Sequence, residues 1–208
     1  MPTWSRWLLA FLVLATVLGV PALRYRSEYT NRKRFREVAP GRLYRSGQFT
    51  AGGLRAIVRD HGIRTVINLQ EENADPYMPE EWLSAPHVLE SDLCRQLGLN
   101  YYALFGGEGV SEAELRNGKR PAVIDDYLRI LDDPANDPVL IHCKAGLHRT
   151  GRLTAIYRME YENWSAGEAM QELRANGYGN FMASEADEYI VQYVQTYRKG
   201  VRCPRSTP

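Results

Sequence analysis

The chain has 208 residues, of which 44% are hydrophobic, so it is long enough for one folded domain of about 160 residues beside a shorter segment. Its formal net charge of +1 gives no electrostatic basis for binding nucleic acid. Its three cysteines are scattered along the chain and do not form the pattern of a disulfide framework.

The N-terminus carries an unbroken apolar or small-residue segment from residue 7 to residue 23. This length is at the short limit for a membrane-spanning helix, which usually needs about 20 residues. A cleaved signal peptide is the alternative, because Val20-Pro21-Ala22 resembles a small-residue cleavage site. The segment has no polar face, which argues against a buried core helix. We therefore expect residues 1–23 to be a transmembrane anchor or a signal peptide.

Residues 24–40 are expected to form a basic linker. Only the amino terminus and Arg6 carry positive charge before the apolar segment, whereas six basic residues follow it: Arg24, Arg26, Arg32, Lys33, Arg34 and Arg36. Positive residues next to a span tend to stay in the cytoplasm, so the pattern favours a single-pass anchor with the folded domain inside the cell. Export through a signal peptide is the alternative. The basic run also suits contact with anionic lipid.

The rest of the chain alternates between strand-like and helix-like patterns. Strands are predicted at residues 43–46, 65–69, 100–104 and 139–142. Helices are predicted at residues 50–61, 79–97, 121–132, 149–163, 165–176 and 184–198. Two cap pairs support the last two helices, Ser165 with Glu168 and Ser184 with Asp187.

This alternation predicts an α/β fold with a mainly parallel central sheet flanked by helices, preceded by a hydrophobic N-terminal helix. The folded domain is expected over residues 41–199, with a disordered tail at 200–208.

The most informative stretch is residues 142–151, His-Cys-Lys-Ala-Gly-Leu-His-Arg-Thr-Gly. It connects a predicted strand to a predicted helix. Backbone N–H groups of such a loop can form an anion-binding nest, and the helix N-terminus adds partial positive charge. The residues expected to supply this nest are Lys144, Ala145, Gly146, Leu147, His148 and Arg149. Arg149 adds a planar fork for two phosphate oxygens, and Gly146 permits a turn with positive φ. The pattern predicts a phosphate site.

The same surroundings favour the thiolate form of Cys143, which is the nucleophilic form of a cysteine. A thiolate beneath a bound phosphoryl group would attack phosphorus and give a cysteinyl-phosphate, which water then hydrolyses. Arg149 and the loop amides would stabilise the charge in both steps. The Thr150 hydroxyl is expected to hydrogen-bond the sulfur, and His142 to orient the loop. This chemistry requires no cofactor and no metal.

The stretch resembles the His-Cys-x5-Arg-Ser/Thr signature of cysteine-based protein tyrosine and dual-specificity phosphatases, and every defining position is present. Residues 41–48, Gly-Arg-Leu-Tyr-Arg-Ser-Gly-Gln, resemble the opening strand of the atypical, bacterial-type dual-specificity branch. Plant and fungal inositol-pyrophosphate phosphatases also share the Tyr-Arg-Ser opening and the His-Arg-Thr-Gly ending. The resemblance covers residues 40–198. It implies Cys143 as the nucleophile, Arg149 as the phosphate clamp and a phosphorylated substrate.

A departing alcohol or phenol needs a proton donor that faces the cysteine. The resemblance implies an aspartate upstream of the nucleophile, but the chain has none between Asn100 and Ile124. Glu108, in a glycine-rich loop, is therefore the candidate acid. The alternatives are Glu112, which also suits a helix cap, and the acidic residues after the second predicted strand, Glu71, Glu72 and Asp75.

The substrate class stays open between two alternatives. A phosphorylated protein (at tyrosine, serine or threonine) is the main prediction. An inositol phosphate, inositol pyrophosphate or phosphoinositide is the alternative, since Lys144 and His148 make the loop more basic than its backbone requires, and resemble residues of lipid and inositol-pyrophosphate phosphatases. The membrane is the other expected partner, and nucleic acid is not expected.

Three other interpretations compete with a phosphatase. Structural zinc needs four ligands in paired clusters, and Cys94, Cys203, His61 and His87 form no second cluster. A sulfurtransferase of the rhodanese type has a shorter loop. A catalytically dead phosphate-binding protein would explain the missing aspartate, but the intact Cys143 and Arg149 argue against it. Cys94 is expected to be a buried helical thiol, and Cys203 to lie in a polar tail.

Overall fold

The structure, a computed structural model, describes residues 2–26, 32–81, 87–104, 112–117, 119–179 and 188–201. Its main sheet has five strands in the order β1-β2-β7-β3-β6. In that order the strands are β1 (Arg36–Ala39), β2 (Leu43–Gly47), β7 (Val139–Cys143), β3 (Thr65–Asn68) and β6 (Asn100–Ala103). β1 is antiparallel to β2, and all other neighbours are parallel. The predicted α/β fold is confirmed, with β7 at the centre of the sheet.

Helices follow the strands in the predicted order. They are α1 (Thr3–Arg26), α2 (Ala51–His61), α3 (Glu90–Gln96), α4 (Glu112–Arg116), α5 (Ala122–Asp132), α6 (His148–Tyr161), α7 (Ala166–Ala175) and α8 (Glu188–Thr196), with a short 3-10 turn at Pro134–Asn136. The bounds of α2, α5, α6 and α7 lie within two residues of the predictions. The Ser165–Glu168 capping box is confirmed at the start of α7. The Ser184–Asp187 pair lies outside the described residues.

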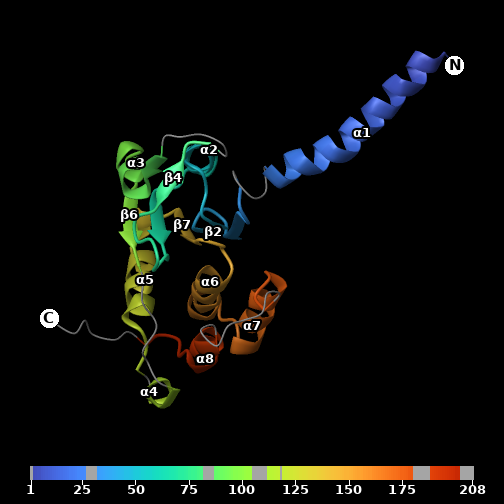
Figure 1. Cartoon of the computed structure of the whole chain (residues 1–208). Helices are drawn as coiled ribbons and strands as arrows, with labels where there is room; N and C mark the ends of the chain where they lie inside the picture. Colours follow the sequence, from blue (N-terminus) through green and yellow to red (C-terminus); the bar gives the residue numbers. More distant parts are fainter. Residues whose placement is uncertain are drawn as a thin grey trace.

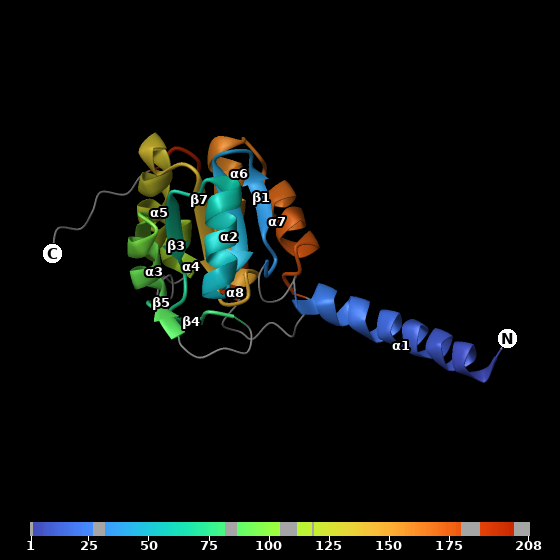
Figure 2. The ribbon, with the colours of Figure 1, turned by 90° about the horizontal axis from the view of Figure 1, so that it is seen from above.

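Two apolar clusters hold the helices against the two faces of the sheet. Figure 2 looks onto the face that α2 covers. Successive residues of a strand point to opposite faces. Val139, Ile141 and Cys143 of β7 therefore pack into the cluster that includes α5, α6, α7 and α8, whereas Leu140 packs into the cluster that includes α2 and α3. β7 is buried along its whole length, and its carboxyl end is fixed from both faces.

The predicted helix over residues 79–97 is wrong in its first half. Residues 77–79 form strand β4 (Tyr77–Pro79), which pairs antiparallel with β5 (His87–Leu89), and α3 begins only at Glu90. The pairing of two short strands overrides the local helical pattern, and Pro79 fits an edge strand because it has no N–H to pair. His87 was predicted on a helix and instead lies exposed in β5. Cys94 is a buried helical thiol, as predicted, and burial raises its pKa to about 12.

The folded sheet extends into the predicted 24–40 linker. β1 occupies residues 36–39 and pairs with β2, and a turn at residues 32–35 precedes it. Residues 27–31 of the linker and residues 202–208 of the predicted tail, with Cys203, lie outside the described residues. The predicted linker therefore contains a structural edge of the domain.

Helix α1 projects away from the sheet domain, and none of its residues is buried (Figure 1). Its 24 residues correspond to about 36 Å of helix, against a hydrocarbon thickness of about 30 Å. Its most apolar window has a mean hydropathy of 2.0. By length and composition α1 is able to cross a bilayer, and a signal sequence would pass the same test.

Candidate active site

The candidate site lies at the carboxyl end of the parallel sheet, where α/β folds usually bind ligands. Cys143 is the last residue of β7, α6 begins at His148, and the loop between them forms a tight connection. Cys143 is 4% exposed. The strand, loop and helix predicted around residues 142–151 are therefore present. We call residues 143–149 the 143–149 loop.

Three carbonyl groups of this loop are held from outside. The Lys144 carbonyl accepts a hydrogen bond from the backbone N–H of Gln48 at 3.3 Å, the Ala145 carbonyl from Arg34 Nη1 at 2.9 Å, and the Gly146 carbonyl from Arg45 Nη2 at 3.0 Å. In a planar trans peptide the N–H points opposite to the C=O. The next three N–H groups along the chain therefore face the other way. One of them, the N–H of Gly146, donates to Cys143 Sγ at 3.2 Å.

Residue 146 has to be a glycine for two reasons, its backbone conformation and the lack of room for a side chain. Its φ is +73°, as predicted, and a Cβ built on it would lie 2.4 Å from the backbone nitrogen of Gly47 and 2.6 Å from the carbonyl carbon and oxygen of Ser46. These are atoms of a central strand, so they have little freedom to move. The 143–149 loop therefore packs directly on the end of β2.

Two arginines, the buried Arg45 and the half-buried Arg34, lie behind the loop. Arg45, on β2, is 4% exposed. Burial lowers its pKa to about 10, and the attraction of Glu172 opposes this effect, so the guanidinium stays protonated at neutral pH. Arg34 comes from the turn before β1. Both side chains donate to carbonyls of the loop, so they stabilise its shape and add positive charge near Cys143.

Arg149, on the first turn of α6, is held by the loop that follows β3. Its Nη1 donates to the Leu69 carbonyl at 2.9 Å, and its Nη2 to Glu72 Oε2 at 2.9 Å. Although burial opposes the effect, hydrogen bonds from its own backbone amide and from Arg149 hold the pKa of Glu72 below its ordinary value. Glu72 is therefore ionised at neutral pH. The pair fixes the guanidinium at the edge of the 143–149 loop.

A buried polar network supports the loop from the opposite face of the sheet. His142 Nε2 lies 2.9 Å from Glu90 Oε1, close enough for an ion pair but without the alignment of a hydrogen bond, and both side chains are at most 3% exposed. The Tyr101 hydroxyl donates to the Ala74 carbonyl at 2.9 Å and contacts Glu90 Oε2 at 3.3 Å. The Asn68 amide donates to the Tyr101 hydroxyl and to the Ala74 carbonyl. The network joins β7 to α3 and to the segment that carries Glu72.

The remaining predicted loop residues differ in their surroundings. Lys144 is exposed, and Leu147 is buried. The half-buried His148 makes an edge contact with Tyr178, with ring centroids 5.5 Å apart. Thr150 is fully buried, and within the described part of the chain its hydroxyl has no hydrogen-bond partner. The predicted bond from Thr150 to the sulfur is therefore absent here, and the sulfur accepts a hydrogen bond from the Gly146 N–H.

The structure describes the side chains of only some of the candidate acids. Glu108 and the side chain of Glu112 lie outside the described residues. Asp75 accepts hydrogen bonds from the Ser91 backbone N–H at 2.9 Å and from the Ser91 hydroxyl at 2.7 Å. It therefore caps the start of α3. Glu72 is paired with Arg149, as described above.

Sequence reasoning did not identify Arg34, Arg45 and Glu90 as parts of the site. Arg45 lies in the Tyr-Arg-Ser opening that resembles known phosphatases, so that motif was the available signal. Glu90 and Arg34 had no local signal, because their contacts depend on the folded arrangement of distant segments.

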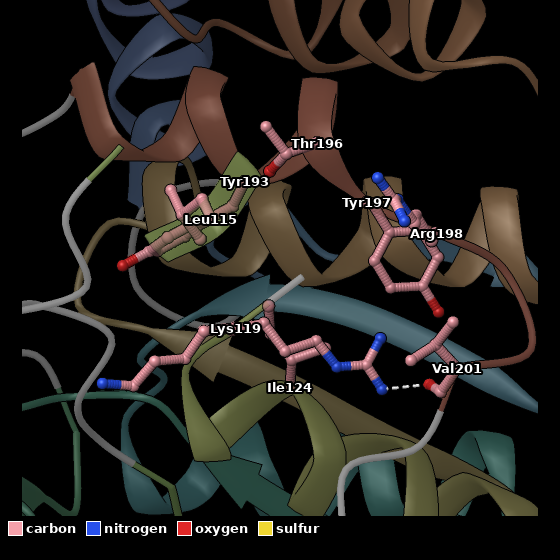
Figure 3. Close-up of a pocket in the computed structure, with 9 residues that line it drawn as sticks. Leu115, Lys119, Ile124, Tyr193, Thr196, Tyr197, Arg198 and Val201 are labelled. Atoms are coloured by element: carbon pink, nitrogen blue, oxygen red, sulfur yellow. Dashed lines mark hydrogen bonds between the residues drawn. The ribbon is translucent and has the colours of Figure 1, made fainter. Parts of the chain in front are cut away.

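A separate pocket lies between the start of α5 and the end of α8 (Figure 3). Two of its three basic side chains have acidic partners, since Arg120 pairs with Asp125 at 2.5 Å and Lys119 with Glu114 at 2.6 Å, and the third is Arg198. Among the described residues, no group of three or more histidine, cysteine or acidic side chains is placed to hold a metal ion. The 143–149 loop offers an anion a backbone N–H group and the N-terminus of α6.

A parallel sheet whose central strand ends in a cysteine, followed by a tight loop and a helix, is the arrangement expected of a cysteine-based phosphatase domain. Comparisons with known proteins support this class. A model described as the tyrosine phosphatase family matches residues 16–160, and one described as the dual specificity phosphatase catalytic domain matches residues 123–199. The first covers more than half of the chain. The chain belongs to the cysteine-based tyrosine phosphatase family.

Its relatives include two groups. Inositol diphosphatase DSP2 of Oryza sativa is 31% identical over 163 residues, which are 78% of this chain and 69% of the relative. Inositol diphosphatase DSP3 of Arabidopsis thaliana is 33% identical over 134 residues, and the match covers 64% of this chain and 58% of that relative. The dual specificity protein phosphatase TpbA of Pseudomonas aeruginosa is 42% identical over only 43 residues, 21% of this chain and 20% of TpbA.

Solved structures share the fold. The catalytic core of SIW14 from Saccharomyces cerevisiae matches with a TM-score of 0.56 at 22% identity, covering 80% of this chain and 86% of that one. TpbA matches with a TM-score of 0.54 at 21% identity, with the same coverage. The expected dual-specificity phosphatase-like architecture is confirmed.

We predict that Gly146→Ala disrupts the loop. The alanine would meet backbone atoms of β2 and would also adopt a conformation that costs about 1–2 kcal/mol for a non-glycine residue. Hydrolysis of an aryl phosphate should fall at least about 100-fold, because a shift of the order of 1 Å at a catalytic loop has that effect.

Gly41→Ala is the matched control. Gly41 also has positive φ, at +65°, but nothing lies within 4 Å of a Cβ there, so this variant tests conformational strain alone. It should lose about 1–2 kcal/mol of unfolding free energy and keep its activity. Equal activity of the two variants would contradict the packing argument.

Proposed function

We propose that this protein is a metal-independent phosphatase that hydrolyses phosphate monoesters through a cysteinyl-phosphate on Cys143. One observation carries the proposal. The carbonyls of residues 144–146 are all bonded on the outside of the loop, so that the following N–H groups point to the other side, where the Gly146 N–H donates to Cys143 Sγ. A ring of N–H groups around a cysteine sulfur suits a phosphoryl group that sits on that sulfur.

In the proposed reaction the Cys143 thiolate attacks phosphorus in line with the leaving oxygen. The S–P bond forms as the P–O bond breaks, and the leaving oxygen takes a proton from a general acid. Water then attacks phosphorus, phosphate departs, and the thiolate is restored. Arg149 and the inward amides stabilise the charge of the phosphoryl oxygens in both steps.

Glu108 remains our proposed acid, on sequence grounds. The pairing with Arg149 supports excluding Glu72 from this role, because a carboxyl group whose pKa is lowered is deprotonated at neutral pH. The hydrogen bonds to Ser91 likewise support excluding Asp75. The absence of the expected aspartate favours substrates with good leaving groups, which need less protonation.

The main proposal for the substrate is a phosphorylated protein, as the name of TpbA indicates for that relative. An inositol phosphate, inositol pyrophosphate or phosphoinositide is the second candidate, as the names of the rice and Arabidopsis relatives indicate for them. The observation that favours the second candidate is the number of cations near the loop: Lys33, Arg34, Arg45, Lys144 and Arg149. A binding protein without turnover is the alternative of another class, and the intact Cys143 and Arg149 argue against it.

We also propose that α1 anchors the enzyme in a membrane with the catalytic domain in the cytoplasm. The exposed apolar surface of α1 supports the anchor. The basic residues that follow α1 support the cytoplasmic orientation of the domain. Lys33 lies seven residues beyond Arg26, the last residue of α1, so the chain between them spans at most about 25 Å. An anchored α1 would keep the catalytic loop near the lipid surface.

The activity proposal predicts hydrolysis of para-nitrophenyl phosphate by the full-length protein in the presence of EDTA. Cys143→Ser should abolish turnover, because a serine hydroxyl at neutral pH is a far weaker nucleophile than a thiolate. Phosphate release and trapping of a phosphorylated adduct by mass spectrometry measure the two steps. A wild-type protein that binds vanadate but releases no phosphate would instead establish the binding-protein alternative.

Glu108→Gln should reduce hydrolysis of an alkyl phosphate by about 100-fold or more, in line with the usual effect of general acid catalysis. Hydrolysis of para-nitrophenyl phosphate should fall much less, since its leaving group needs little protonation. Glu112→Gln serves as the comparison, because it removes the neighbouring alternative. Equal losses on both substrates would remove Glu108 from the mechanism.

The anchor proposal predicts that the full-length protein stays in the membrane fraction after washes with high salt and alkaline carbonate. A variant lacking residues 2–23 should become soluble. Intact-protein mass spectrometry distinguishes the alternative, because a signal peptide would leave a shortened chain that begins after Ala22.

A further inference from the structure

The turn that precedes β1 is attached to the 143–149 loop. Residues 32–35 form this turn, closed by a hydrogen bond from the Phe35 N–H to the Arg32 carbonyl at 2.7 Å. Arg34 has a φ of +52°, in the left-handed region that few residues other than glycine adopt. Such a conformation persists where surrounding contacts over-determine it. Here the Arg34 side chain bonds to the Ala145 carbonyl, and the Lys33 carbonyl accepts from the Gly47 N–H at 2.7 Å.

These contacts place Lys33 beside the reacting sulfur. A Cβ on Gly47 would lie 2.9 Å from Cγ and Cδ of Lys33 and 3.0 Å from the Ala145 carbonyl oxygen. The aliphatic stem of Lys33 therefore lies over Gly47. Gly47 in turn pairs in register with Cys143 across the β2–β7 ladder. The absence of a side chain at residue 47 leaves the space that the lysine stem occupies.

The electrostatic surroundings of Lys33 are predominantly positive. Burial lowers the pKa of Lys33, the positive charges of Arg34 and Lys144 lower it further, and Cys143 opposes them. Within the described part of the chain the Lys33 ammonium has no hydrogen bond and no ion pair, whereas Arg34 is bonded to the loop. A half-buried ammonium among other cations is unfavourable unless an anion is present.

We propose that Lys33 is a specificity-determining residue that binds a second phosphate group of the substrate, next to the phosphate held by the 143–149 loop. This inference rests on the proposed phosphatase function. The loop amides and Arg149 suffice for one phosphate, and the unpaired ammonium of Lys33, with the exposed Lys144 near it, provides donors for another. A second phosphate site favours the second substrate candidate over the phosphorylated protein: a molecule with two or more phosphates close together, either a soluble inositol polyphosphate or a phosphoinositide headgroup.

The test uses the full-length protein and compares kcat/KM for three substrates. Phenyl phosphate carries one phosphate, a soluble inositol polyphosphate carries several, and a phosphoinositide bisphosphate in phosphatidylcholine vesicles presents the headgroup. Lys33→Gln should lower the ratio of polyphosphate to phenyl phosphate kcat/KM at least about tenfold, mainly through KM, because a hydrogen bond to a charged group is lost. The polyphosphate source that shows the larger loss identifies the substrate form.

Two control variants accompany Lys33→Gln. Lys33→Arg keeps the positive charge and should retain most of the ratio. Arg32→Gln removes a neighbouring, exposed positive charge of the same turn and should leave the ratio within about twofold of wild type, because exposed charges contribute little. Melting temperatures of the four proteins show whether the turn remains folded.

Three results would overturn the proposal. A loss of kcat/KM by the same factor on all three substrates would assign Lys33 to the Cys143 thiolate instead of to a second phosphate. Unchanged kcat/KM on all three substrates would leave Lys33 without a role in specificity, as would a wild-type enzyme that hydrolyses phenyl phosphate and neither polyphosphate. A wild-type protein inactive on phenyl phosphate as well would contradict the proposed function itself.

Discussion

The outward hydrogen bonds of three consecutive carbonyl groups hold the 143–149 loop in its shape. Because peptides are planar, the N–H groups that follow these carbonyls point to the opposite side of the backbone, and the one of Gly146 donates to Cys143 Sγ. Each outward bond therefore has an effect on the opposite side of the backbone. The donors are a backbone N–H and two arginines from the segment 34–48, so the first part of the folded domain shapes the loop that ends its central strand.

Two further interactions complete this arrangement. The Glu72 carboxylate holds Arg149 at one edge of the loop, and the Glu90 carboxylate lies against His142 beneath the sheet. They are connected, because Asn68 and Tyr101 both bind the Ala74 carbonyl in the segment that follows Glu72. Arg149 and the base of the loop are therefore supported by one polar network. Such a network needs all of its members, since each unpaired buried polar group is costly.

Residues 32–39, between α1 and the rest of the sheet, belong to the folded domain and do not act only as a linker. Arg34 bonds to the loop, Lys33 lies over Gly47, and β1 adds the antiparallel edge strand. The chain that leaves α1 thus enters the candidate site within a few residues. The short sequence distance between α1 and Lys33 therefore links the apolar helix closely to the 143–149 loop.

The sequence by itself determined the parts of the protein that are local. The strand, loop and helix around residues 142–151, the positive φ of Gly146, the capping box at Ser165 and the apolar helix all depend on residues close together in the chain. The parallel sheet also followed, because alternating strands and helices have few other arrangements. The helix predicted over residues 79–97 was wrong, because the pairing of β4 with β5 overrides local propensity there.

Only the tertiary structure decided which distant residues complete the site. Arg34, Arg45 and Glu72 are separated from their partners in the loop by 111, 101 and 77 residues. No local pattern encodes such contacts, because they depend on the register of β2 and β3 against β7. The hydrogen-bonded ladders fix that register, and the ladders form only when the two apolar layers close over the sheet.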